Sequence, residues 1–250
     1  MSAEIVLSVG REVRRSPLPG HTSLRDAAGG GGRPGDKEIA ALRRRVIEQP
    51  RLGRRCWYCH VSFGQTEMFE VHHLDGDHGN DGQDNVVLIC LLCHIPWHLD
   101  LVIQTWAHDP GRIIYLPEVS QQELNAMLYA VFFHSEATID RSPENKRVEE
   151  SERVAAAVYE RLAARDVDVE QVHGQVERPG LSKVHAMVRT LQSLDAAEYA
   201  RRESLFDGCR YLPPWSPMLA LAPSFALNGA MFNRLQIDSW PAIACQHGAH

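Results

Sequence analysis

The spacing of apolar residues predicts a chain that is mostly helical, with a few short strands. Apolar positions recur at helical intervals in five segments, residues 36–49, 121–135, 150–165, 182–194 and 195–206. Ser120 with Glu123, and Asp195 with Glu198, have the spacing of a capping box and mark the starts of two of these helices. Strands are expected at residues 4–9, around residues 69–74 and at the start of 111–120, and helical character after Asn85. The fold class predicted is α+β.

Breaks in this pattern divide the chain into three regions. Residues 16–35 are rich in Gly, Pro and Ser, which is typical of a flexible segment, and residues 135–152 are polar. We therefore expect an N-terminal strand and flexible segment in residues 1–35 and a compact domain in 36–135. Residues 136–250 are expected to form a helical region that ends in an irregular, apolar, proline-interrupted tail.

Composition places the chain among soluble globular proteins. It has 250 residues, 44% hydrophobic and 23% charged. No apolar run reaches the ~18 residues that span a bilayer, and the first residues lack the pattern of a secretion signal. The expected location is the cytoplasm, where cysteines stay reduced.

Four of the six cysteines form two C-x-x-C pairs, Cys56 with Cys59 and Cys90 with Cys93. Two residues between cysteines allow one tight turn to direct both thiolates at one metal ion, and two such turns complete a tetrahedral shell. In a reducing compartment this pattern favours metal binding over disulfides. The sequence predicts a structural Zn²⁺ site on these four residues.

Histidines lie both in the insert between the two cysteine pairs and directly after the second pair. His94 and His98 are four residues apart, so they would share one face of a helix. With one of the adjacent His72 and His73 they could supply three ligands to a second divalent metal and leave a position open, which is the ligand count of a catalytic site.

Charge is distributed unevenly around these residues. Residues 1–55 carry twelve Lys/Arg and six Asp/Glu, whereas residues 56–100 carry seven Asp/Glu and no Lys or Arg. Binding of nucleic acid depends on basic side chains that neutralise phosphates, so the acidic residues 56–100 disfavour it. The arginines of residues 43–55 form either a solvated helix face or a contact with nucleic acid or an acidic partner.

The adjacent histidines, the asparagine and the two later histidines resemble the HNH, or ββα-metal, nuclease motif in its zinc-stapled form. The resemblance implies that His72, His94 and His98 bind a metal. It also implies that His73 is the general base and that Asn85 orients it by hydrogen bonds across a hairpin. As a fold, it implies an HNH-like core held by the Cys₄ site.

A longer stretch resembles the IcmJ/DotN family of type IVB secretion and conjugation systems. The similarity runs through "RCWYC", "EVHHLDGDHGN", "DNVVLICLLCHIPWHLD" and "LPEVSQQEL", and continues in "SLDAAEYARRESLFDGCRYLP". It implies a zinc-stabilised adaptor that binds the C-terminal region of the coupling ATPase and other subunits of the coupling complex. Such a protein would lie at the inner face of the inner membrane through its partners, without membrane insertion.

Two functions follow from these observations. The preferred one is a non-catalytic adaptor that helps to present substrates for translocation. The alternative is a metal-dependent HNH endonuclease that uses His73 as its base. A zinc-bearing DNA-binding module is disfavoured by the acidic residues between Cys56 and Asp100.

Overall fold

The computed structural model describes residues 4–9, 36–63, 69–77, 79–135, 146–166 and 182–226. The glycine-rich segment of residues 16–35 and most of the apolar tail lie outside these ranges. None of the helices in the described part of the chain is both long and apolar enough to cross a bilayer.

The first part of the chain is built around a β-hairpin. Strand β1 (Glu70–His73) pairs antiparallel with β2 (Val86–Ile89), in a register that places His73 opposite Val86. Helix α2 (Asp36–Ile47) packs against both strands and is followed by the short 3₁₀ turn η1 (Pro50–Leu52). After β2 the chain enters α3 (Leu91–His94), the 3₁₀ turn η2 (Ile95–His98) and α4 (Leu99–Thr105). A hairpin thus leads directly into a short helix.

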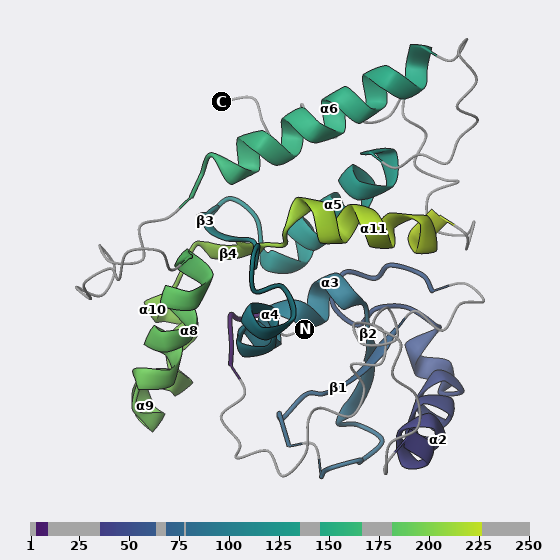
Figure 1. The fold of residues 1–250 in the computed structure, drawn as a ribbon. Helices are drawn as coiled ribbons and strands as arrows, with labels where there is room; N and C mark the ends of the chain where they lie inside the picture. Colours follow the sequence, from purple (N-terminus) through teal and green to yellow (C-terminus); the bar gives the residue numbers. More distant parts are fainter. Residues whose placement is uncertain are drawn as a thin grey trace.

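Longer helices dominate the second part of the molecule (Figure 1). Helix α5 (Gln121–Ser135) packs against α6 (Lys146–Ala163) on one side and α11 (Trp215–Ala226) on another. Helices α8 (Lys183–Ser193), α9 (Ala196–Ala200) and α10 (Arg202–Leu205) form a separate group.

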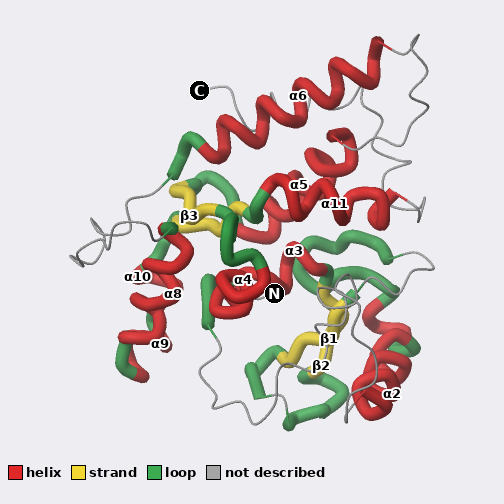
Figure 2. The backbone as a smooth tube through the Cα atoms, viewed as in Figure 1, coloured by secondary structure: helices red, strands yellow, loops and turns green. Residues whose placement is uncertain are grey.

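A second two-stranded sheet joins segments that are far apart in the sequence (Figure 2). Strand β3 (Arg112–Tyr115) pairs antiparallel with β4 (Cys209–Leu212). Gly111 precedes β3 with a φ of +82°, and a Cβ there would overlap the carbonyl oxygen of Leu212. The sheet links the predicted 36–135 domain to the predicted C-terminal region, so these regions share a core.

The N-terminal residues 4–9 also connect the two parts, although not as the strand that their alternation predicts. They pair with neither sheet. The backbone N–H of Ser8 donates to the carbonyl of Pro96, and that of Leu99 donates to the carbonyl of Ser8. The Tyr199 hydroxyl donates to the Val9 carbonyl and accepts from its N–H. The partners are a turn and a side chain rather than a strand edge, so no ladder forms.

Most predicted elements are present, with three corrections. Residues 86–89, expected to be helical, form β2, because the run Val-Val-Leu-Ile has high strand propensity and lies between the hairpin loop and Cys90. Residues 195–206 form two short helices that are separated at Arg201. The segment after Gly208, where no period was visible, contains β4 and α11. Helices with two small sheets agree with the predicted α+β class.

Candidate metal centre

The first cysteine pair lies in a tight turn after η1. The backbone N–H of Cys56 donates to the carbonyl of Val61, and the N–H of His60 donates back to the carbonyl of Cys56. His60 adopts a left-handed φ of +59°, which closes the turn. The N–H of Trp57 donates to the carbonyl of Leu88 in β2, with an N···O distance of 2.8 Å. The turn is therefore fixed to the strand that leads to the second pair.

The second pair starts where β2 ends. Cys90 directly follows Ile89 and precedes the first residue of α3, and Cys93 lies within that helix. One residue at a helix start and another three positions later lie on the same side of the first turn, so both thiols face the first pair.

The four sulfur atoms all lie within 4.8 Å of one another. Cys56, Cys90 and Cys93 are buried and Cys59 is half-buried. The Sγ atoms of Cys59 and Cys90 are 3.6 Å apart, and the backbone N–H of Cys90 lies 3.4 Å from Cys56 Sγ. A buried group of four thiols with a backbone donor directed at one of them can hold a metal ion, and the predicted convergence of the two pairs is confirmed.

The thiols influence one another's ionisation. Burial raises the pKa values of Cys90 and Cys93. For Cys56 burial acts in the same direction, but hydrogen bonds from the other three thiols and from the Cys90 N–H outweigh it and hold its pKa well below the ordinary value. The site thus favours a thiolate at Cys56, the form that binds a metal ion.

Side chains from the first cysteine turn and from α5 surround the cluster. Burial raises the pKa of Tyr58 and of Tyr129, and the nearby cysteines act in the same direction. The Asn125 side-chain N–H₂ lies 3.5 Å from Cys93 Sγ and donates to the Leu92 carbonyl at 3.0 Å. Sequence reasoning missed Asn125 and Tyr129. Their signal was the spacing of four residues that places Gln121, Asn125 and Tyr129 on one face of the helix.

The histidines lie beside the cysteine cluster. His94 ends α3 and His98 ends η2, so the two are not on one continuous α-helix, yet their Nε2 atoms are 3.2 Å apart. The His72 ring meets the His94 ring edge-on, with centroids 5.6 Å apart, and also contacts Trp97. Among the described residues, the four cysteines are the group whose ligand atoms converge tightly enough to form a candidate metal site.

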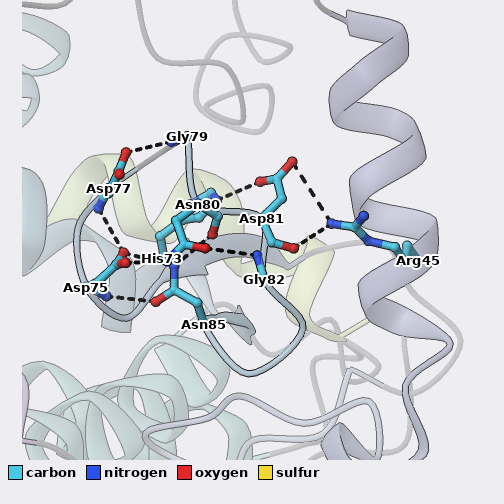
Figure 3. Close-up of polar contacts among 9 residues, drawn as sticks. All are labelled: Arg45, His73, Asp75, Asp77, Gly79, Asn80, Asp81, Gly82 and Asn85. Atoms are coloured by element: carbon cyan, nitrogen blue, oxygen red, sulfur yellow. Dashed lines mark hydrogen bonds and ion pairs between the residues drawn. The ribbon is translucent and has the colours of Figure 1, made fainter.

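His73 points to the hairpin loop instead (Figure 3). Its Nε2 atom is 2.9 Å from Asp81 Oδ1, and Arg45 of α2 donates to the Asp81 carbonyl. Asn85 closes the loop: its side-chain oxygen accepts from the Asp75 N–H, and its N–H₂ donates to the Asn80 carbonyl and to the Asp75 carboxylate.

The arginines before Cys56 also contact the hairpin. Arg43 lies 3.6 Å from the carboxylate of Glu70, which is almost fully buried, and stacks on Phe69. Arg51 donates to the carbonyls of Gln83 and Val86. Arg45 and Arg51 are exposed, as on a solvated face, whereas Arg43 is half-buried against Glu70. All three contact the hairpin of their own chain.

No protein-family model matches the chain. Over 211 residues, 84% of this chain and 83% of the relative, it is 24% identical to "Type 4 apparatus protein DotN" of Legionella pneumophila subsp. pneumophila strain Philadelphia 1. The match extends across both the cysteine-containing part and the helical part. The chain is therefore a distant match to a type 4 apparatus protein, which supports the family indicated by its sequence.

Proposed function

We propose that this protein is a zinc-stabilised adaptor of a type IVB secretion or conjugation coupling complex. It would bind the C-terminal region of the coupling ATPase, help to present substrates and lie at the inner face of the inner membrane through its partners. The observation that carries this proposal is the similarity to DotN, which covers more than four fifths of both chains. In the adaptor, Zn²⁺ on Cys56, Cys59, Cys90 and Cys93 would hold an HNH-like core in residues 36–135.

The surroundings of the hairpin support a non-catalytic role. The Nε2 atom of His73 is in contact with Asp81, so base chemistry at this residue would have to use its other ring nitrogen. The loop around it presents Asp75, Asp77 and Asp81, which repel a phosphate backbone. Three of the arginines that could offset this charge, Arg43, Arg45 and Arg51, contact the hairpin itself.

The adaptor role is tested by capture on the immobilised C-terminal region of the coupling ATPase from the same system. The full chain should be retained at micromolar concentration and should elute with free ATPase tail. A tail of scrambled sequence is the matched control. Equal retention on both tails, or on neither, would contradict the proposal.

The alternative function is an HNH endonuclease, and one observation favours it. His94 and His98 face each other, with His72 against His94, so the proposed ligands of a second divalent metal are neighbours. His73 would be the base and Asn85 would position it.

Plasmid nicking with Mg²⁺, Mn²⁺, Ni²⁺ and Zn²⁺ distinguishes the two functions. The adaptor should nick no faster than its His73→Ala variant with any of the four metals. Metal-dependent nicking that disappears in His73→Ala would establish the nuclease and overturn the non-catalytic part of the proposal.

A further inference from the structure

Three polar side chains lie on the inner face of α5, in a segment whose helix was predicted from its apolar residues. Gln121, Asn125 and Tyr129 are spaced four residues apart, so they share one face of the helix. Each is at most 3% exposed. Burial of two amides in a protein core is unfavourable unless their hydrogen-bonding groups are satisfied, so the partners of this row determine what it can do.

At the metal-centre end, the row contacts the second cysteine pair. The two N–H groups of Asn125 face the Leu92 carbonyl and Cys93 Sγ, at 3.0 and 3.5 Å. Tyr129, one turn later, is buried, and its burial and the nearby Cys90 raise the pKa of its hydroxyl. A donor directed at a thiolate sulfur stabilises its negative charge and fixes its direction, which is how groups around the ligands tune a metal site.

At the other end of the row, Gln121 forms hydrogen bonds with the edge of β4. The Gln121 side-chain oxygen accepts from the backbone N–H of Tyr211 at 2.7 Å, and its N–H₂ donates to the Tyr211 carbonyl at 3.0 Å. A side-chain amide that both donates to and accepts from one residue imitates a neighbouring strand. The strand edge is thereby paired without a third strand in the sheet.

The two ends are joined by one hydrogen bond. The second N–H of Gln121 donates to the Asn125 side-chain oxygen at 2.9 Å. Every side-chain N–H and both oxygens of the two amides are then engaged, so rotation of either amide by a half-turn would break several bonds. The geometry of Cys93 and that of Tyr211 are coupled through this pair, although the residues are more than a hundred positions apart.

We propose that Asn125 is a positioning residue for the metal centre, and that the Gln121–Asn125 pair couples metal binding at Cys93 to the hydrogen bonding at the edge of β4. The proposal rests on the metal centre inferred above, and it is independent of the secretion role. When the thiols hold a metal ion, Asn125 is fixed against Cys93, Gln121 is fixed against Asn125, and the edge of β4 is paired. The metal site therefore organises the sheet that joins the two parts of the molecule.

Reconstitution with Co²⁺ tests the positioning role. Asn125→Leu fills the space but removes the donor to Cys93, and it should increase the rate of Co²⁺ release to a chelator by about ten-fold. It should also shift the sulfur-to-cobalt charge-transfer band. Asn125→Asp keeps the shape and adds a charge beside the thiolates, so it should release Co²⁺ faster still. Met127→Ala, on the exposed face of the same helix, is the control and should match the wild type.

Amide hydrogen exchange of β4 tests this coupling. In Co²⁺-loaded Asn125→Leu, the Tyr211 amide should exchange roughly five-fold faster than in the loaded wild type, although no altered atom touches Tyr211. Gln121→Leu should show the same increase in exchange.

Three results would contradict three different claims. A wild type that binds no stoichiometric Co²⁺ contradicts the metal centre itself. A wild type that binds Co²⁺ but shares its release rate and charge-transfer band with Asn125→Leu overturns the positioning role. Unchanged Tyr211 exchange in Asn125→Leu overturns the coupling.

Discussion

Cys56, Cys59, Cys90 and Cys93 lie in two different backbone settings that bring their sulfur atoms to one point. The first pair lies in a turn closed by the left-handed residue His60, and the second lies at the junction between β2 and α3. Cys209 is also buried, but it lies in β4 and does not belong to the cluster. This difference provides a matched comparison between two buried thiols.

We predict that Cys90→Ser lowers the metal content of the purified protein from about one zinc ion per chain to well below that ratio. A hydroxyl is a poorer ligand than a thiolate, and three cysteines leave the tetrahedral shell incomplete. Metal analysis and the midpoint of thermal unfolding measure the effect. Cys209→Ser, the control, should keep its metal. Full zinc content in Cys90→Ser would contradict the Cys₄ assignment.

Asp75 is the residue around which the hairpin loop closes. Hydrogen bonds from the Asn80 side chain, the Asp77 N–H and the Asn85 side chain hold the pKa of its carboxyl below the ordinary value of 3.8. A lowered folded-state pKa means that the charged form stabilises the fold. This contribution is complete above pH 3.8 and disappears as the pH falls through the folded-state pKa.

The loss of stability in Asp75→Ala should therefore depend on pH. The difference in unfolding midpoint between this variant and the wild type should be constant near neutral pH and should shrink below pH 3.8. Because the two proteins are compared at each pH, any acid release of metal affects both. Asp84→Ala, in the same exposed loop, is the control. A difference that persists unchanged at low pH would show that Asp75 acts without its charge.

At the scale of elements, α2 and the turn η1 that follows it supply the arginines that contact the hairpin. Arg43, Arg45 and Arg51 each contact a different part of the segment from Glu70 to Val86. Glu70 is 1% exposed and lies in β1, so its carboxylate needs a charged partner in the interior. The contrast between the basic segment and the acidic segment that follows it thus reflects packing within the chain.

We predict that Arg43→Ala destabilises the protein by about 2–3 kcal/mol, because the Glu70 carboxylate stays buried after its guanidinium partner is removed. Arg44→Ala, an exposed neighbour on the same helix, should change stability by less than about 0.5 kcal/mol. Denaturant unfolding measures both values. Glu70→Gln in the Arg43→Ala background should recover part of the loss, whereas equal effects of Arg43→Ala and Arg44→Ala would contradict the buried pairing.

At the scale of the whole molecule, several connections unite the cysteine-containing part and the helical part, and two of them involve the backbone of distant segments. One is the β3–β4 sheet. The other is the N-terminal segment, in which Ile5, Leu7 and Val9 are each 4% exposed, and Ser8 contacts both Pro96 and Arg202. A molecule connected in this way should unfold as one cooperative unit.

Leu7→Ala should lower the stability by about 3 kcal/mol and shift a single unfolding transition as a whole. Tryptophan fluorescence and far-ultraviolet circular dichroism should report the same midpoint. Val6→Ala, in the same segment but only half-buried, is the control and should have a smaller effect. Two separate transitions in the wild type would show that the parts are independent.

The sequence alone determined the features that depend on local spacing. The two C-x-x-C turns, the capping boxes at Ser120 and Asp195 and the helices of residues 121–135 and 182–194 are present because neighbouring residues are sufficient to specify them. The segment after Gly208 could not be assigned, because β4 is stabilised by its pairing with β3 and by Gln121 rather than by a pattern of its own.

Only the tertiary structure decided which polar groups meet. Asp81 beside His73, the three arginines on the hairpin, and Asn125 beside Cys93 bring together residues that no spacing rule relates. The physical reason is that a buried charge or amide requires a partner, while the partner's position depends on how helices and strands pack. The sequence placed the ligands of the metal centre, and the packing of α5 supplied their surroundings.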